Sequence, residues 1–343
     1  MRPPISVGSL DSGSPGTSVG ADGTKSSSAS GFWPIIYILL QSAILNPAPM
    51  SDKLNFLPAS MKTLRSYSLL VLEGPDAVAF IQAQSMNDVK ALVDGQWHWN
   101  GLLNPKGRVI ALFALVRIRA DLLYLVLPDF PSEKLREHLQ RFIFRSKVKL
   151  IVDVEKVFAA EFNSESTSES SRSFISGNLI DGVALDFSSN SSNRRLWILP
   201  ANKAATFPAD SAIEAKWRDL DIEHGLPRLA DTLSEHWTPQ MLSLEHLNAF
   251  SLKKGCYPGQ EIVARTHYLG QAKRQTKLVQ AQYLNANATI NRVGEKVGEL
   301  ICINSTHDKG LAILQNVTDS DVLVCGEHNV KSLQALTGLQ RSN

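Results

Sequence analysis

The sequence is poor in cysteine, with three among 343 residues. Cys256, Cys302 and Cys325 form no C-x-x-C pair, which argues against a structural zinc site. Three thiols are also too few for a disulfide framework, or for holding a four-ligand iron–sulfur cluster within one chain. We therefore expect a reducing, cytoplasmic compartment and no stably bound metal.

Long apolar runs are also missing near the amino terminus. Residues 32–45 are mostly apolar, but this stretch is shorter than the roughly 18–20 residues that span a bilayer as a helix. It also begins too far into the chain for a secretory signal. The Ser- and Gly-rich residues before it are typical of disorder. We expect residues 1–50 to be a disordered, over-extended start; a tail with weak membrane contact is the alternative.

A large excess of charge of one sign is absent as well. The 35 Lys and Arg residues nearly balance the 33 Asp and Glu residues, so the formal net charge is +2. This balance excludes a protein that coats a polyanion along its whole surface, although it permits a local basic patch. A hydrophobic fraction of 43% supports more than one core. We expect a monomer with no membrane contact in its folded part.

From residue 64 onward, short apolar runs alternate with amphipathic stretches. The patterns predict helices at 76–84, 133–144 (with Leu135, Leu139 and Phe142 facing inward) and 211–219. They predict strands at 68–72, 98–103, 109–118, 122–127, 147–154 and 195–199, and, after residue 275, at 277–283, 297–303, 311–317 and 322–325. This alternation favours an α+β architecture with a small β-barrel at the carboxyl end. The Ser-rich residues 164–192 are interpreted as a surface insertion.

Residues 253–277 form the most unusual segment. Six basic side chains face one acid, Glu261, and Gly255 and Gly259 bracket Cys256 in a tight turn. A thiol next to Lys254 and within reach of Arg265 is expected to favour its thiolate form. The functional interpretation is a reactive thiol beside an anion site. The alternative is a buried turn cysteine beside a solvated basic face.

These residues resemble the signature of the YgfZ family of folate-binding proteins, which are relatives of the aminomethyltransferase of the glycine cleavage system. The string 254–261 (KGCYPGQE) carries the resemblance, followed by the single positions Arg265, Gly270, Lys273 and Arg274. Three further stretches, 80–89, 103–108 and 221–227 with Pro239 and Gln240, resemble other family motifs in family order.

The resemblance implies two ferredoxin-like α+β units and a terminal β-barrel around a central cavity for tetrahydrofolate or a one-carbon derivative. We expect a first unit at 55–150, completed by 220–262, a second at 151–219, and a barrel at 263–343. The resemblance places aromatic stacking on folate at Tyr67 and Trp217, with Tyr67 standing where a Trp is expected. Core packing is the plain alternative for Trp217.

The remaining site residues also follow from the resemblance. Arg265, Lys254 and Glu261 are expected near the folate, with Cys256 as the reactive thiol. The other motif positions are Gly255, Tyr257, Gly259, Gln260, Gly270, Lys273 and Arg274. The catalytic Asp of the aminomethyltransferases falls near Ala111 and Leu112, so ordinary aminomethyltransferase activity is not expected.

The implied role is folate-dependent support of iron–sulfur cluster assembly or repair in a subset of enzymes, including those that thiomethylate tRNA. Its partners are a reduced folate and, transiently, iron–sulfur enzymes or cluster carriers. The alternative is a folate-dependent one-carbon transferase that uses Glu261 or Glu223 as acid or base. A weaker third hypothesis is direct tRNA contact through residues 253–277.

Overall fold

The computed structural model describes residues 57–58, 60–165, 167–204, 206–270, 272–315, 317–318 and 320–341. The expectation for residues 1–50 therefore lies outside the described residues. No helix in the described ranges is long and apolar enough to cross a membrane.

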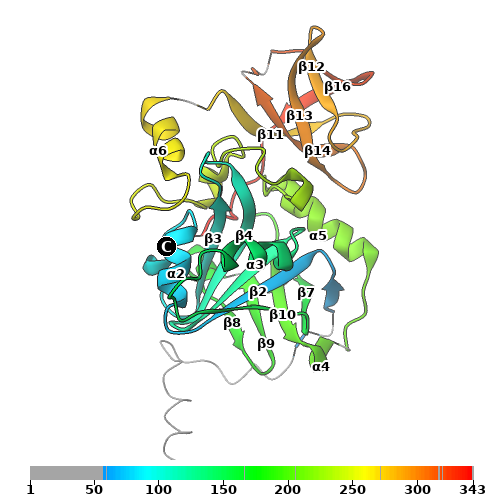
Figure 1. Cartoon of the computed structure of the whole chain (residues 1–343). Coiled ribbons are helices and arrows are strands. Elements are labelled where there is room, and N and C mark those ends of the chain that lie inside the picture. Colours follow the sequence, from blue (N-terminus) through cyan, green and yellow to red (C-terminus); the bar gives the residue numbers. More distant parts are fainter. Residues whose placement is uncertain are drawn as a thin grey trace, which may run out of the picture. The chain divides into compact units, whose positions relative to one another are not determined.

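The first sheet contains five antiparallel strands in the order β3-β4-β5-β2-β6 (Figure 1). Their bounds are β2 Tyr67–Glu73, β3 Gln96–Leu103, β4 Val109–Arg119, β5 Leu122–Pro128 and β6 Lys149–Val152. Helices α2 (Ala77–Gln84) and α3 (Ser132–Gln140) pack on one face. Strand alternation sorts the side chains, so that Leu70 and Leu72 face these helices while Leu69 and Val71 face the second sheet.

The second sheet has the order β1-β7-β10-β9-β8. Its strands are β1 Lys62–Leu64, β7 Lys156–Phe162, β8 Ser176–Asn178, β9 Gly182–Asp186 and β10 Arg194–Pro200, and it is followed by α4 (Ala201–Ala204) and α5 (Ser211–Glu223). Its inner face joins the inner face of the first sheet and one side of α5 in a shared core. Four short 3-10 helices, η1 Val89–Ala91, η2 Glu169–Ser173, η3 Asp231–Leu233 and η4 Leu244–Leu247, lie in the connections.

Helix α6 (Gln260–Leu269) leads into a closed barrel with the strand order β11-β14-β13-β12-β15-β16. The barrel strands are β11 Arg274–Gln280, β12 Thr289–Arg292, β13 Glu295–Ile303, β14 Lys309–Gln315, β15 Leu323–Cys325 and β16 His328–Leu333. After β16 the chain returns to the sheets, where the indole N–H of Trp99 donates to the carbonyl of Leu339 at 2.8 Å. The predicted α+β fold with a terminal barrel is confirmed.

Two local expectations differ from the structure. Phe142 lies beyond the end of α3 and is 42% exposed, because helical spacing no longer applies after Gln140. The Ser-rich residues 164–192 are not only a surface insertion, since the buried strand β9 lies within them and pairs with β10. The apolar residues Val183–Leu185 form the centre of this strand, and the surrounding serines give the segment as a whole the composition of a loop.

The expected domain boundaries also differ from the sheets in two places. β1 belongs to the expected first unit but pairs with β7 of the second sheet. The range 263–343, expected to be the barrel, begins inside α6, and the barrel strands begin at Arg274. The first difference depends on strand pairing over a long sequence separation, about which local pattern carries no information; the second depends on where α6 ends.

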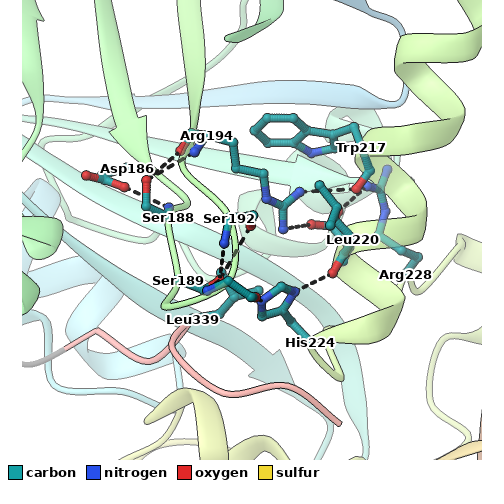
Figure 2. A network of polar contacts seen from close by, with 12 residues as sticks. Asp186, Ser188, Ser189, Ser192, Arg194, Trp217, Leu220, His224, Arg228 and Leu339 are labelled. Carbon is teal, nitrogen blue, oxygen red and sulfur yellow. Dashed lines mark hydrogen bonds and ion pairs between the residues drawn. The ribbon is translucent and has the colours of Figure 1, made fainter. Parts of the chain in front are cut away.

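One buried carboxylate connects the elements of the shared core. Asp221 on α5 forms ion pairs with Arg194 of β10 (Nη2 to Oδ1, 2.8 Å) and with Arg228 (Nη1 to Oδ2, 2.6 Å). All three side chains are fully buried. Arg228 also makes two 3.0 Å bonds to Asp129, which follows β5. The network therefore holds both sheets and α5 together, and Figure 2 shows Arg194, Trp217 and Arg228 within it.

We predict that Asp221→Asn lowers the free energy of unfolding by about 3–5 kcal/mol, because it leaves two buried guanidinium groups short of their shared anion. Denaturant unfolding measures the change. Asp231→Asn is the matched control, since its ion pair with Lys134 is solvent-exposed and should contribute less than about 1 kcal/mol. Equal effects of the two substitutions would contradict the assignment.

Candidate functional site

The cysteine motif forms a loop directly before α6. Cys256 is exposed, whereas Cys302 on β13 and Cys325 on β15 are buried in the barrel. Burial raises the pKa of the Cys302 thiol, which keeps it protonated. Cys256 is therefore the thiol that a molecule in solution can reach.

Lys254 points away from solvent and holds this loop to the first sheet. Its ammonium group donates to the carbonyls of Gln82 and Ser85 at 2.6 Å each and of Asn87 at 3.0 Å, at the C-terminal end of α2. The carbonyls of Gln82 and Ser85 belong to the end of α2, where a helix leaves its last carbonyls unpaired, and Asn87 follows just beyond it. Burial lowers the pKa of Lys254 to about 8. The structure thus places the Lys254 ammonium group against backbone carbonyls of the first α+β unit.

Two glycines bring the hairpin motif 103–108 against the cysteine motif. Gly259 has a φ of +77°, and a Cβ placed on it would lie 2.5 Å from the carbonyl oxygen of Asn104. Gly107 has a φ of +70°, and a Cβ there would lie 2.7 Å from Cβ of Ile262. The two turns are in backbone contact, which explains why both need glycine.

Further hydrogen bonds complete the loop. The amide of Gln260 donates to the carbonyl of Lys254 at 3.1 Å, and Tyr257 is buried beneath the loop, with its pKa raised to about 12 by burial. The amide of Gln240 donates to the carbonyl of Val263 on α6 at 2.8 Å. Contacts from residues 80–89, 103–108 and 254–261, together with Gln240, therefore build a platform beneath Cys256. Residues 221–227 do not take part in these contacts.

The charged motif residues lie on the outside of the platform. Glu261 and Arg265 are exposed on α6, and Gly270 ends this helix. Lys273 and Arg274 are exposed where the chain enters β11. The cationic side chains of Arg265, Lys273 and Arg274 are available to an anionic ligand or partner, in contrast to Lys254.

Tyr67 and Trp217, the two residues expected to stack on folate, lie side by side and contact each other and two arginines. The indole N–H of Trp217 donates to the Tyr67 hydroxyl at 2.8 Å, and both side chains are buried. The guanidinium carbon of Arg228 lies 5.0 Å from the Tyr67 ring centroid, and that of Arg194 lies 4.5 Å from the Trp217 ring. Burial, followed by the charge of Asp221, raises the pKa of Tyr67. Cations already cover these rings, so the expected stacking on folate would require Arg194 or Arg228 to move.

A group of residues that the sequence motifs do not mark surrounds Trp217. We call it the aromatic–arginine cluster, and its members are Trp97, Trp99, Phe187, Trp217, Arg172, Arg194 and Arg341. Their rings pack at centroid distances of 5.4–5.6 Å, with Arg341 placed 4.8 Å from the Trp97 ring. The alternation of Trp97 and Trp99 was the only sequence signal for this cluster, because the three arginines are far apart in the chain.

The arginines of this cluster are not fully paired. Arg172, Arg194 and Arg341 are at most 7% exposed, yet within the described residues Nε of each has no hydrogen-bond partner, and neither has Nη1 of Arg172. Burial lowers the pKa of Arg341 to about 9; Asp186 opposes this shift, whereas the positive charges of Arg172 and Arg194 add to it. The cluster is a buried region with more hydrogen-bond donors than acceptors.

Glu223, a candidate acid or base for one-carbon transfer, lies in an ion pair, and the positions of the aminomethyltransferase aspartate hold apolar side chains. Glu223 forms a 2.6 Å ion pair with Lys309 of the barrel, which raises the pKa of that lysine. Ala111 and Leu112 are buried apolar side chains of β4. In the described ranges, no three His, Cys, Asp or Glu side chains are grouped closely enough to hold a metal ion.

His224 lies beside the cluster in a fixed orientation. Its Nδ1 is 2.7 Å from the carbonyl of Leu220, and its Nε2 is 2.8 Å from the hydroxyl of Ser189 (Figure 2). Because a carbonyl only accepts, the proton is on Nδ1 and the Ser189 hydroxyl donates to Nε2. Burial lowers the pKa of His224, so this imidazole is neutral at pH 7.

We predict that Gly259→Ala destabilises the loop by about 1–3 kcal/mol, because it places a Cβ in a left-handed turn and against the hairpin backbone. It should also speed the reaction of Cys256 with a thiol reagent. Gly255→Ala is the control within the same loop, since a Cβ there meets nothing within 4 Å. If both substitutions gave the same unfolding midpoint, the proposed turn contact would be wrong.

The comparisons with known proteins concern the whole sequence and the fold. No family model matches the chain. The tRNA-modifying protein YgfZ of Colwellia psychrerythraea is 26% identical over 276 residues, covering 75% of this chain and 85% of the relative. The tRNA-modifying protein YgfZ of Vibrio atlanticus is 28% identical over 292 residues, covering 78% and 87%.

Among solved structures, the glycine cleavage system aminomethyltransferase T of Bartonella henselae superposes with a TM-score of 0.63 at 16% identity. The match covers 82% of this chain and 86% of that enzyme. At this identity the likeness concerns the fold. The resemblance read from the motifs is confirmed: the chain is similar to proteins named tRNA-modifying protein YgfZ over more than three quarters of those proteins' length, and it has the fold of the glycine-cleavage aminomethyltransferase.

Proposed function

We propose that this protein binds a reduced folate and supports the assembly or repair of iron–sulfur clusters in a subset of enzymes, including those that thiomethylate tRNA. Cys256 is the reactive group in this proposal. The similarity to proteins named tRNA-modifying protein YgfZ and the aminomethyltransferase fold support it.

The observation that carries the folate part is the aromatic–arginine cluster. A buried guanidinium N–H without an acceptor is costly, by about 1–3 kcal/mol or more for a charged group. Arg194 and Arg341 bring such N–H groups close to the rings of Trp217 and Trp97, and the indole N–H of Trp97 donates to the backbone carbonyl of Arg172. A folate combines flat aromatic rings with a glutamate that carries two carboxylates, and so matches both properties of the cluster.

The charges of these residues therefore fit a folate. The Trp217 ring is in contact with Arg194, which would have to move for a folate ring to stack there. Because Arg194 lies on the Trp217 face, folate entry would exchange a cation–π contact for an aromatic stack and a carboxylate contact. When bound, a reduced folate supplies a one-carbon unit or reducing equivalents. The protein's own residues neutralise its carboxylates and exclude water from its rings.

The second part of the proposal depends on the exposure of Cys256. A cluster is held by about four ligands, and the other two cysteines are buried in the barrel. Cys256 therefore acts as one transient ligand to iron whose remaining ligands belong to a partner. The thiol loses its proton to solvent when it binds the metal. The platform beneath the loop keeps the thiol outside, where a partner protein can approach it.

We predict that Arg172→Gln raises the dissociation constant for tetrahydrofolate about tenfold or more, because it removes a cation whose Nε and Nη1 have no acceptor among the described residues. The substitution should not lower the unfolding temperature, for the same reason. Isothermal titration calorimetry measures the binding. Arg195→Gln is the control, since Arg195 lies on the same strand as Arg194, half-buried and outside the cluster. Unchanged affinity in Arg172→Gln would move the folate site elsewhere.

We further predict that Cys256→Ser fails to restore the activity of iron–sulfur enzymes in a strain that lacks this protein. The serine variant should fold and bind tetrahydrofolate like the wild type, because Cys256 is exposed. Cys302→Ser is not a suitable control, because Cys302 is buried. Ser251→Ala removes the hydroxyl that accepts from the backbone N–H groups of Lys253 and Lys254 and leaves the thiol in place, so it tests whether structural damage to the loop alone abolishes complementation. Full complementation by Cys256→Ser would refute the role of this thiol.

A further inference from the structure

The aromatic–arginine cluster is closed to solvent. Its four rings and its three arginines are each at most 7% exposed. A folate would need the face of a ring and the N–H groups of a guanidinium at the same time, and the fold covers both. A ligand therefore reaches the cluster only if one of the segments around it moves.

One of these segments is residues 336–341, which we call the strap. Leu339 in the strap is 2% exposed and belongs to the shared core, and its carbonyl accepts the indole N–H of Trp99 at 2.8 Å. Arg341 is 1% exposed, and its guanidinium carbon lies 4.8 Å from the Trp97 ring centroid. Displacement of the strap would uncover the indole N–H of Trp99 and the ring of Trp97.

The strap has few backbone bonds to the rest of the protein. Residues 334–341 form neither a strand nor a helix. Within the described residues one backbone–backbone hydrogen bond joins the strap to another segment, from the N–H of Leu336 to the carbonyl of Glu223 at 2.8 Å. Gly338 lies against Ser189, since a Cβ placed on this glycine would be 3.0 Å from the Cβ of that serine (Figure 2). The strap can therefore leave without breaking a sheet ladder.

The other segments around the cluster are fixed more firmly. The tryptophans lie on β3 and α5, and Arg194 lies on β10. The turn between β9 and β10 is bonded to β10, because the N–H of Phe187 donates to the carbonyl of Arg194 at 2.9 Å and the N–H of Arg194 donates to the Ser188 hydroxyl at 3.1 Å. The Ser189 hydroxyl is also 2.8 Å from Nε2 of His224 on the α5 side. The strap is therefore the segment whose displacement disturbs the sheets least.

The charges of the cluster also act on the strap. In the closed position the Arg341 guanidinium donates to the backbone carbonyls of Gly338 and Asp186, but its Nε has no partner among the described residues. It is buried in the same region as Arg172 and Arg194, and like charges repel each other there. Water would solvate this cation if the strap opened. An anion bound among the three arginines would remove the repulsion and hold the strap closed.

We propose that the strap is a gate for the aromatic–arginine cluster, which opens while both sheets stay folded and closes again over a bound folate. The closing step rests on the proposed folate function, whereas the opening step needs no ligand. A segment with few backbone hydrogen bonds opens at a lower free energy than the whole fold. A ligand that binds the closed form better shifts the equilibrium toward closure.

Thiol labelling of the full chain in a Cys256→Ser background tests the opening, with Ellman's reagent as the probe. Leu339→Cys reports on the strap, and Ala160→Cys, on β7 in the same core and 1% exposed, is the matched control. We expect Leu339→Cys to react at least about 100-fold faster than Ala160→Cys, at a rate that sub-denaturing urea leaves unchanged. Leu336→Cys, at a position that is 41% exposed, gives the unhindered rate.

Hydrogen exchange of the unsubstituted chain is the second measurement, because Leu339→Cys could itself loosen the strap. The amides of residues 336–341 should exchange independently of urea, whereas urea should speed the exchange of the β4 amides. Saturating 5-formyltetrahydrofolate should slow the labelling of Leu339→Cys at least tenfold.

Equal labelling rates of Leu339→Cys and Ala160→Cys, or equal acceleration of both by urea, would overturn the gate whatever the folate does. Unchanged labelling of Leu339→Cys while calorimetry shows bound folate would overturn the closing step. Fast labelling of Leu339→Cys without any folate binding would support the opening and refute the folate function alone, so the two failures are distinguishable.

Discussion

The buried Asp221 carboxylate is the interaction on which the arrangement of the two sheets depends. It lies on α5 and receives guanidinium groups from β10 and from the segment after α5, while Arg228 continues the network to Asp129 beyond β5. Burying arginines is unfavourable unless their charge is balanced and their N–H groups find acceptors. Balance at this position requires α5 and both sheets to meet in one register.

The same network explains the environment of the folate candidates. Arg194 and Arg228 must reach Asp221, and their paths pass over the rings of Trp217 and Tyr67. The two aromatic residues that the family resemblance assigns to folate therefore serve the core first. Arg172, Arg194 and Arg341 keep buried N–H groups without a hydrogen-bond partner among the described residues, and these groups are the basis of the folate site proposed above.

In the cysteine loop a buried lysine is balanced by backbone carbonyls and not by a carboxylate, and its hydrogen bonds fix the loop to the first sheet. Lys254 gives its three N–H donors to the carbonyl end of α2, and Gly259 and Gly107 let two backbones touch. Motifs that are about 150 residues apart in the chain thus build one rigid platform. Such a platform keeps a single thiol exposed without requiring the thiol itself to make any structural contact.

Local pattern determined much of this protein from the sequence alone. Strand alternation and helix spacing placed β2, α2, β4, β5 and α5 within a few residues, and the motif around Cys256 revealed the resemblance to the YgfZ proteins. These features depend on neighbours within a few positions, which a sequence displays directly. The same reasoning failed for β9, because a short buried strand inside a Ser-rich segment has the composition of a loop.

Only the tertiary structure decided where the charges of the motifs go. Lys254 and Arg265 look equivalent in the sequence, but one is buried against α2 and the other is exposed. Arg172, Arg194 and Arg341 meet in one cluster although no motif connects them. Long-range packing sets the burial and the partners of each charge, and these quantities determine whether a cation is part of the scaffold or free to bind a ligand.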